Sequence, residues 1–334
     1  MTRSTSILTP AVRRAASYLL FLSTIGCANS FALAQDIAID SSTAGRQSAS
    51  DTLPFPPSVE PGQAPEGSVG GMGDINLYPK RIVIDRRQRI ATVGLYNKTA
   101  NTGDYEIDVK DMVMTPQGGV YALDNLPEGV SVERLKGAAE MLRWSPRRVA
   151  LRGSESQTVR IMSRPAADLP DGEYRSHFSV VAIPPQADAG LSIEDAVMGG
   201  SSAASGIGVS IKPRFGISIP VIVRVGETTL DVGLRIDGVV EIQSGLALAL
   251  TVARSGTRSA FGDVLITLEG SSEPVAIARG VGVYPEVDSR DVVIPFSADF
   301  DTSQLRSGSI LAVSFIDDDV NPGSTLARQD FVVP

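Results

Sequence analysis

The segment Asp171–Phe178, DGEYRSHF, brings a carboxylate, a guanidinium and the single histidine of the chain within a few residues of one another. Acids, bases and imidazoles are the groups that general acid–base catalysis uses. His177 and Phe178 are neighbours, however, so in an extended segment one faces the core and the other faces away. A lone histidine on a strand is usually structural, and we expect no enzyme. Carboxylates paired only in space stay invisible to sequence analysis, so that alternative remains open.

The densest acidic cluster is Asp317–Asp319, within FIDDDVNPGS. Three carboxylates attract hard cations, but the ligand spacing of a calcium loop is missing, and the segment is typical of a solvated hairpin tip. The glycine-rich GSVGGMGD neither follows a strand nor precedes a helix, which argues against phosphate binding. One histidine cannot build a His-based metal site. We therefore expect neither a metal nor a cofactor.

Composition narrows the class of protein. The 334 residues are 43% hydrophobic and 20% charged, which supports packed cores, and 32 glycines with 21 prolines indicate short elements joined by turns. A net charge of −8 repels phosphate backbones, so we expect no nucleic-acid partner.

The first 34 residues have the pattern of a secretory signal peptide. Arg13 and Arg14 precede an apolar run over residues 15–26, and Ala32-Leu33-Ala34 is a cleavage site before Gln35. The run is too short for a comfortable membrane span, and no later segment approaches one. Cys27, the only cysteine, lies in this leader; lipidation is the alternative, although the leucine usual three residues earlier is absent. After cleavage at Ala34 the chain has no disulfide and no thiol.

Three further regions follow the leader. Residues 35–72 are small, polar and proline-rich, which predicts a disordered extension. Residues 73–225 alternate apolar and polar positions and predict an immunoglobulin-like β-sandwich. Residues 226–334 predict a second all-β domain. The expected strands are Arg81–Asp85, Arg89–Tyr96, Tyr105–Met114, Val149–Leu151, Gln157–Ser163, Tyr174–Ile183 and Ile207–Val225 in the first domain, and Thr229–Ile236, Ala247–Ala253, Val264–Leu268, Val275–Val283, Val292–Phe296 and Ile310–Ile316 in the second.

The strand predicted over 206–225 is unusually long and apolar on one face. Its odd positions are nearly all apolar, whereas its even positions are mostly small or polar. Pro213 and Pro220 lack N–H donors, which confines them to a sheet edge or to bulges. A long apolar edge strand promotes aggregation unless something covers it. The long loop before it, residues 186–205, has the small-residue composition of a functional or disordered loop.

Four segments, taken in order, resemble the periplasmic chaperones of the chaperone–usher pilus pathway. They are YPKRIVIDRRQRIATVGLYNKT (Tyr78–Thr99), WSPRRVALRGSESQTVRI (Trp144–Ile161), LPDGEYRSHFSVVAIPP (Leu169–Pro185) and ISIPVIVR (Ile217–Arg224). The resemblance covers roughly Asn76–Val225 well. It extends more weakly into the second domain, at Ala253–Gly270 and Ala278–Pro295.

The resemblance implies two immunoglobulin-like domains and a function without catalysis. Such chaperones insert the last strand of their first domain into the groove of an incomplete pilin-like subunit and deliver the subunit to an outer-membrane usher. This is β-augmentation, in which main-chain hydrogen bonds give affinity and alternate side chains fill pockets. The donor side chains implied here are Ile207, Val209, Ile211 and Phe215, and Arg81 is implied as the anchor for the terminal carboxylate of the subunit.

The resemblance also implies an ion network between the domains, in which Glu173 pairs with Arg160 and Arg224. A surface acid in a turn is the alternative for Glu173. A second cationic anchor is expected in the last strand, but its position holds Pro220, and Lys212 or Arg214 are candidates to replace it. The extension over 35–72 is likewise unusual for the family. A different class of function, an exported structural or adhesive protein that buries 207–225 permanently, is the competing hypothesis.

Overall fold

The computed structural model describes residues 63–71, 73–184 and 214–334. These residues belong to one compact unit, Asp51–Pro334. The signal peptide, Cys27, most of the extension and the predicted donor residues Ile207, Val209 and Ile211 lie outside the described residues. Within the described part of the chain, strands and two short 3-10 turns are the regular elements, so the all-β prediction is confirmed.

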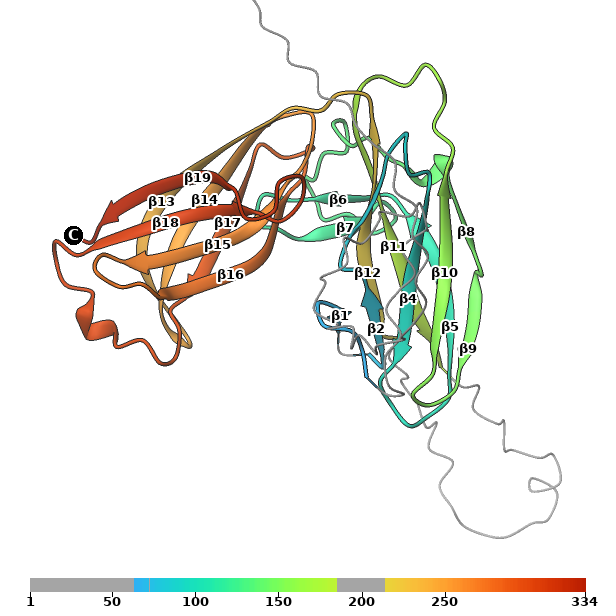
Figure 1. Ribbon diagram of the computed structural model, residues 1–334, viewed down its shortest axis with the longest axis horizontal. Helices are drawn as coiled ribbons and strands as arrows, with labels where there is room; N and C mark the ends of the chain where they lie inside the picture. Colours follow the sequence, from blue (N-terminus) through green and yellow to red (C-terminus); the bar gives the residue numbers. More distant parts are fainter. Residues whose placement is uncertain (1–62, 72, 185–213) are drawn as a thin grey trace, which may run out of the picture. The chain divides into compact units, whose positions relative to one another are not determined.

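The first β-sandwich consists of two five-stranded sheets (Figure 1). One sheet has the order β1-β2-β4-β10-β8, and the other has the order β3-β12-β11-β5-β9. The bounds in the first sheet are β1 Val69–Gly70, β2 Ile75–Tyr78, β4 Ile90–Asn97, β8 Leu142–Ser145 and β10 Ser156–Ser163. The bounds in the second sheet are β3 Ile82–Ile84, β5 Gly103–Lys110, β9 Arg148–Leu151, β11 Gly172–Ile183 and β12 Gly216–Val225. A hairpin of β6 (Met112–Met114) and β7 (Val120–Ala122) and a 3-10 turn, η1 (Ala139–Met141), complete this part.

Alternation of apolar and polar residues explains these strands. In β5, Tyr105, Ile107 and Val109 are buried while the residues between them are exposed or half-buried. Successive side chains of a strand point to opposite faces, so one face of β5 packs into the sandwich and the other meets water. The inward faces of both sheets supply one hydrophobic core, which includes Leu77, Val93 and Phe178.

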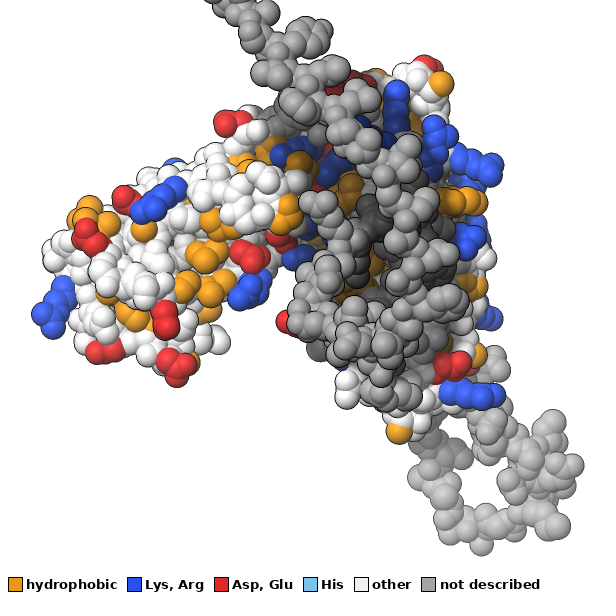
Figure 2. Space-filling model, viewed as in Figure 1, with side chains coloured by type: hydrophobic (Ala, Val, Ile, Leu, Met, Phe, Trp, Pro, Cys, Tyr) orange, Lys and Arg blue, Asp and Glu red, His pale blue; other side chains and the backbone are white. Residues whose placement is uncertain are grey.

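The second β-sandwich packs a three-stranded sheet, β13-β14-β17, on a four-stranded sheet, β16-β15-β18-β19. The bounds are β13 Leu230–Ile242, β14 Gly245–Gly256, β15 Ala260–Leu268, β16 Pro274–Val283, β17 Ser289–Pro295, β18 Ile310–Asp317 and β19 Thr325–Val332, with a 3-10 turn, η2, at Thr302–Gln304. Its core includes Val264, Val313 and Phe315. Figure 2 shows hydrophobic side chains over β15 and β16 on the face turned to the viewer, and Ile277 of β16 is 40% exposed.

Both sandwiches have immunoglobulin-like strand order. In the first, β2 and β4 pair with β10 and β8, opposite a sheet that contains β5, β11 and β12. In the second, β13 and β14 pair with β17, opposite a sheet that contains β15, β18 and β19. Two of the connections at which the chain crosses between the sheets of the first sandwich run from β2 to β3 and from β8 to β9. Pro79 and Pro146 lie in these crossings. A proline interrupts the hydrogen-bonded ladder, which suits a point where a strand leaves one sheet for the other.

The structure corrects several sequence predictions about its elements. Residues 63–71 of the expected disordered extension are ordered: β1 pairs with β2, Asn76 Nδ2 donates to Ser68 Oγ at 3.2 Å, and Lys98 Nζ donates to Gly71 O at 3.2 Å. The strand predicted at 105–114 breaks at Asp111 into β5 and β6. The terminal strand β19 was not expected, because its exposed polar face hides the alternation. No helix in the described ranges is long and apolar enough to cross a membrane.

Candidate functional site

The strand β12 has a covered half and an open half. It pairs with β11 along its whole length, from Gly216↔Val181 to Val225↔Gly172. On its other side β3 pairs with it only at Val221, Ile222 and Val223. Among the described residues no strand pairs with Gly216–Pro220 on that side. Backbone N–H and C=O groups along this edge are therefore available to a further strand.

The side chains of β12 change environment along the strand. Ile219, Val221 and Val223 are buried in the core of the first sandwich, and Ile217 packs against that core. Phe215, just before the strand, is 41% exposed and borders a shallow pocket with Ile75, Tyr105 and Val180 among its lining residues. The apolar face of the described strand therefore fills its own core, and Phe215 is where this face reaches the surface.

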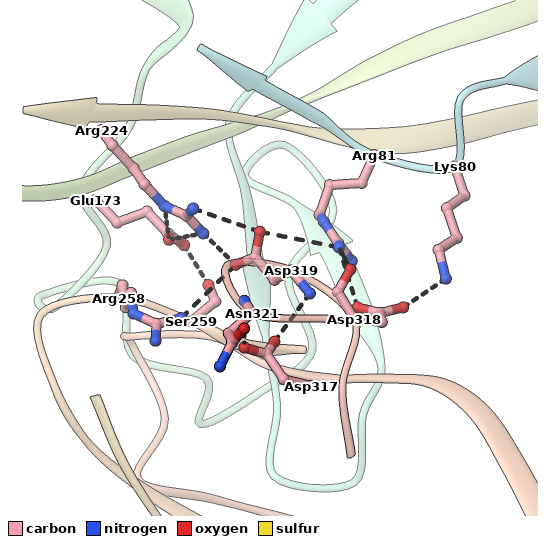
Figure 3. Close-up of polar contacts among 10 residues, drawn as sticks. All are labelled: Lys80, Arg81, Glu173, Arg224, Arg258, Ser259, Asp317, Asp318, Asp319 and Asn321. Carbon is pink, nitrogen blue, oxygen red and sulfur yellow. Dashed lines mark hydrogen bonds and ion pairs between the residues drawn. The ribbon is translucent and has the colours of Figure 1, made fainter. Parts of the chain in front are cut away.

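Glu173 lies in a buried ion network rather than in a surface turn (Figure 3). It is the second residue of β11, is 1% exposed, and accepts hydrogen bonds from Arg224 Nε at 3.3 Å and Arg224 Nη2 at 3.4 Å. The hydroxyl of Ser259 also donates to Glu173. Register explains the first contact, because Glu173 and Arg224 are direct partners across β11 and β12.

The second carboxylate of the network comes from the turn between β18 and β19. Arg224 forms an ion pair with Asp319, which is 4% exposed at its side chain, and Arg258 Nη1 lies 3.8 Å from the same carboxylate. Burial alone lowers the pKa of Arg224, but hydrogen bonds and charge from Asp319 and Glu173 outweigh it and raise the pKa above the ordinary value. A guanidinium between two carboxylates is a compensated buried charge.

The acidic turn itself is therefore folded, which corrects the prediction of a solvated hairpin tip. Asp317 is 2% exposed, and its side chain accepts from the backbone N–H groups of Asp319 and Asn321, both at 2.9 Å. These bonds fix the turn and aim Asp318 and Asp319 at the cations of the first sandwich. Sequence analysis missed Asp319 as a partner. The expected network paired two arginines with a single glutamate, which leaves one positive charge without a carboxylate. That imbalance of charge was the available signal for a second acidic residue.

Arg160 does not join this network. It is exposed on β10, between the buried Val159 and Ile161. Since alternate residues face opposite sides, Arg160 points out of the sandwich, and β10 belongs to the sheet that does not contain β11 or β12. The expectation that it pairs with Glu173 is wrong. Ser259 contacts Glu173 instead, and Arg258 joins the network through Asp319.

Arg81 is engaged within the protein. Its Nη2 donates to Asp318 O at 2.8 Å and to Asp318 Oδ1 at 3.0 Å, and its guanidinium carbon lies 4.2 Å from the centre of the Phe261 ring. Lys80 pairs with the other carboxylate oxygen of Asp318. Arg81 immediately precedes Ile82, the partner of Val221, so the parallel register places it opposite Pro220. Arg214, a candidate substitute for the absent lysine, instead pairs with Glu106 at 3.3 Å on the surface; Lys212 is outside the described residues.

Arg175 and His177 of DGEYRSHF belong to a second buried cluster. Arg175 is 2% exposed, forms an ion pair with Glu286, and lies with its guanidinium carbon 3.7 Å from the centre of the Tyr284 ring. His177 Nδ1 is 3.1 Å from Arg175 Nη1. Burial first, and the charge of Arg175 second, hold the pKa of His177 well below its ordinary value. A neutral imidazole that accepts a hydrogen bond from arginine fits a structural histidine.

Comparison with known proteins gives matches among solved structures only. No family model matches the chain, and no curated protein matches it. The YadV chaperone is 14% identical, with 78% of this chain and 100% of that chain covered and a TM-score of 0.39. The Pseudomonas aeruginosa CupB2 chaperone is 12% identical, with 76% and 97% covered and a TM-score of 0.38. A structure of the Salmonella enterica SafA pilin in complex with the SafB chaperone gives 15% identity, 79% and 99% coverage and a TM-score of 0.37.

Proposed function

We propose that this protein is a periplasmic chaperone that caps pilin-like subunits by adding the β12 edge to an incomplete subunit fold and then passes them to an outer-membrane usher. The observation that carries the proposal is the open edge at Gly216–Pro220, next to the exposed Phe215. An unpaired edge is a template for strand addition, and most soluble proteins protect such edges. This mode of binding needs no catalytic group and no cofactor.

The division of β12 supports the same function. A donor strand has to be held firmly by its own domain while one edge stays available. The covered half, Val221–Val225, is buried and tied through Arg224 to two carboxylates. The open half keeps its pairing to β11, so an added strand would extend an existing sheet. We assign residues 73–225 to the subunit-binding domain and 226–334 to the second domain, and Ile207, Val209 and Ile211 to the donor side chains that precede Phe215.

The signal-peptide pattern over residues 1–34 supports export, and cleavage after Ala34 would release a periplasmic chain that begins at Gln35. The intact mass of the exported protein tests this assignment. A mass that starts at Gln35 agrees with it, whereas a lipid-sized addition on Cys27 contradicts it.

Co-expression with a pilin-like subunit of the same genome tests the function. We expect the subunit to accumulate and to co-purify with the wild-type protein, and Phe215→Ser to reduce the amount recovered. Arg214→Ser is the matched control, because Arg214 is an exposed residue beside Phe215 whose side chain contacts Glu106 and Ala182 on the surface. A stable subunit that never co-purifies with the wild-type protein contradicts the chaperone function and favours an exported structural or adhesive protein.

A further inference from the structure

The strand β4 is buried on both of its faces, from Ala91 to Asn97. Its inward residues, among them Val93 and Leu95, belong to the core of the first sandwich. Its outward residues include Thr92 and Tyr96, which are only 6% and 4% exposed. The outward face of an antiparallel sheet commonly meets water, as the charged outward residues of β5 do. The burial of its outward residues therefore identifies this side of β4 as a covered surface.

The covered surface is lined by two tyrosines with a glycine between them. Register places Tyr78 of β2 opposite Gly94 of β4, and Asn76 opposite Tyr96, so the two tyrosines are diagonal neighbours on one face. Gly94 has no side chain, which leaves a shallow floor between them. Burial is the main reason that the pKa of Tyr96 is raised, and Tyr78 adds to the rise. We call Tyr78, Thr92, Gly94 and Tyr96 the tyrosine face; aromatic-lined grooves of this kind bind proline-rich segments.

The chain itself approaches this face from its N-terminal side. β1 pairs with β2 and is the outermost strand of the same sheet. Before β1, the Ser68 N–H donates to Pro65 O at 3.1 Å and Gly67 has a φ of 78°, which together make a β-turn. Pro65 is buried although it lies beyond the last strand of the sheet. The residues that precede Gln63 therefore start at the edge of this sheet, on a path that turns back toward it.

The preceding segment, TLPFPPSVEP at residues 52–61, has the composition that fits the tyrosine face. Its four prolines favour an extended polyproline II conformation and lack N–H donors, so the segment suits a sheet face better than a sheet edge. Leu53, Phe55 and Val59 supply apolar side chains. Ten residues at about 3.1 Å each span about 30 Å. The five strands of the sheet, about 4.8 Å apart, are only about 20 Å across.

Charge favours the same segment over a second copy of the protein. The outward face of this sheet carries Arg143 on β8 and Arg160 on β10, both exposed, and no outward position of the described strands β2, β4, β8 and β10 is a carboxylate. Residues 35–62 carry four carboxylates and one arginine. A second copy docked face to face would bring arginines against arginines, which is unfavourable, whereas the acidic extension complements them.

We propose that residues 52–61 dock across the tyrosine face, with prolines and Phe55 packed on Tyr78 and Tyr96. The first sandwich then carries a cover supplied by its own N-terminal extension, which shields an aromatic surface from solvent and from other chains. Composition alone predicts a disordered extension, because it takes no account of a surface built to receive it. This inference concerns the chain by itself and does not depend on the proposed chaperone function.

The test is hydroxyl-radical footprinting of the full mature protein, read for each residue by mass spectrometry. Leu53→Ser together with Phe55→Ser removes two apolar side chains from the docking segment. Ile37→Ser together with Ile39→Ser is the matched control, because it makes two apolar-to-serine changes in the extension but outside that segment. Both double variants leave every described residue unchanged, so a difference between them does not arise from a folding defect of the sandwich.

We expect Tyr78 and Tyr96 to react at least about threefold faster in the variant of the docking segment than in the wild-type protein, because loss of two buried apolar side chains shifts the docking equilibrium by about tenfold or more. The control variant should match the wild-type protein. In the reverse direction, Thr158→Glu places a carboxylate opposite Gly94 and should raise the reactivity of Phe55. Ser314→Glu, at a half-buried position of β18, should not.

Equal reactivity of the two tyrosines in the wild-type protein and in the variant of the docking segment overturns the proposal, whether the tyrosines are protected in both or exposed in both. Protection that is lost on dilution identifies a second copy as the cover and overturns it as well. No subunit takes part in the experiment, so these results leave the proposed chaperone function standing.

Discussion

The two halves of β12 share one strand and one alternation of side chains, yet they differ in what holds them. Val221–Val225 has a strand on each side for most of its length, and its arginine is tied to Glu173 and Asp319. Gly216–Pro220 has β11 on one side only. A sheet edge is stabilised in its own fold by one neighbour and remains available to another. Under the proposed function, the covered half carries stability and the open half carries binding.

Removal of the charge in the covered half should have the largest effect on stability. Arg224→Ala leaves the buried carboxylates of Glu173 and Asp319 facing each other without their shared cation. Loss of one member of a buried ion network costs about 3–5 kcal/mol. Urea unfolding of the purified protein measures this cost. Arg214→Ala, on the exposed approach to the same strand, should change the free energy of unfolding by less than about 0.5 kcal/mol.

If Arg224→Ala unfolds at the same urea concentration as the wild-type protein, the network contributes no stability. The distinction between the halves would then rest on pairing with β3 alone. Arg224→Lys sharpens the result, because it keeps the charge but loses the two-pronged geometry and should fall between the wild-type protein and the alanine variant.

Two apolar side chains of the same face should separate stability from binding. Ile219→Ala empties a site that is 1% exposed and should cost about 2–4 kcal/mol of folding stability. Phe215→Ala removes a side chain that is 41% exposed and should cost under about 1.5 kcal/mol, while it lowers subunit capture. Thermal unfolding and subunit co-purification on the same pair of variants provide the measurements. A Phe215→Ala variant as unstable as Ile219→Ala would favour the structural or adhesive alternative.

The contrast between the halves also shows what sequence can and cannot predict. Alternation in Ile217–Val225 and in Tyr105–Val109 predicted the strands, because one buried face leaves a period-2 pattern. The same alternation does not say which partner an apolar face meets. In the described part of the strand, Ile219, Val221 and Val223 meet their own core. The pairing of Glu173 with Arg224 followed from the resemblance. Arg160 lies outside the ion network and Asp319 lies inside it because of the sheet that each strand joins. Pairing between distant segments leaves no local signal in the sequence.

A smaller effect should come from pH, through the histidine beside Arg175. His177 is buried, its pKa is lowered, and Arg175, Glu286 and Tyr284 lie around it, with Lys110 as its cross-strand partner on β5. The unfolded state therefore binds a proton more readily than the folded state does. Because of this difference in proton binding, the free energy of unfolding is highest above the ordinary histidine pKa of about 6.5 and decreases as the pH falls below that value.

We therefore expect the urea midpoint of the wild-type protein to fall between about pH 6.5 and pH 5, and His177→Gln to flatten this part of the profile. The measurement compares the two profiles over that range, and the difference between them reports on His177. Parallel profiles for the two proteins would contradict the assignment of a buried neutral His177.

The central claim is that the edge at Gly216–Pro220 is open in the free protein and is covered by a strand of the subunit in the complex. Amide hydrogen exchange of β12, followed with and without a pilin-like subunit of the same genome, tests it most directly. We predict that outward amides of Gly216–Ile219 exchange fast in the free protein and become protected in the complex, while amides of Val221–Val225 stay protected in both. Protection of the whole strand in the free protein, with no change on addition of the subunit, would contradict the claim.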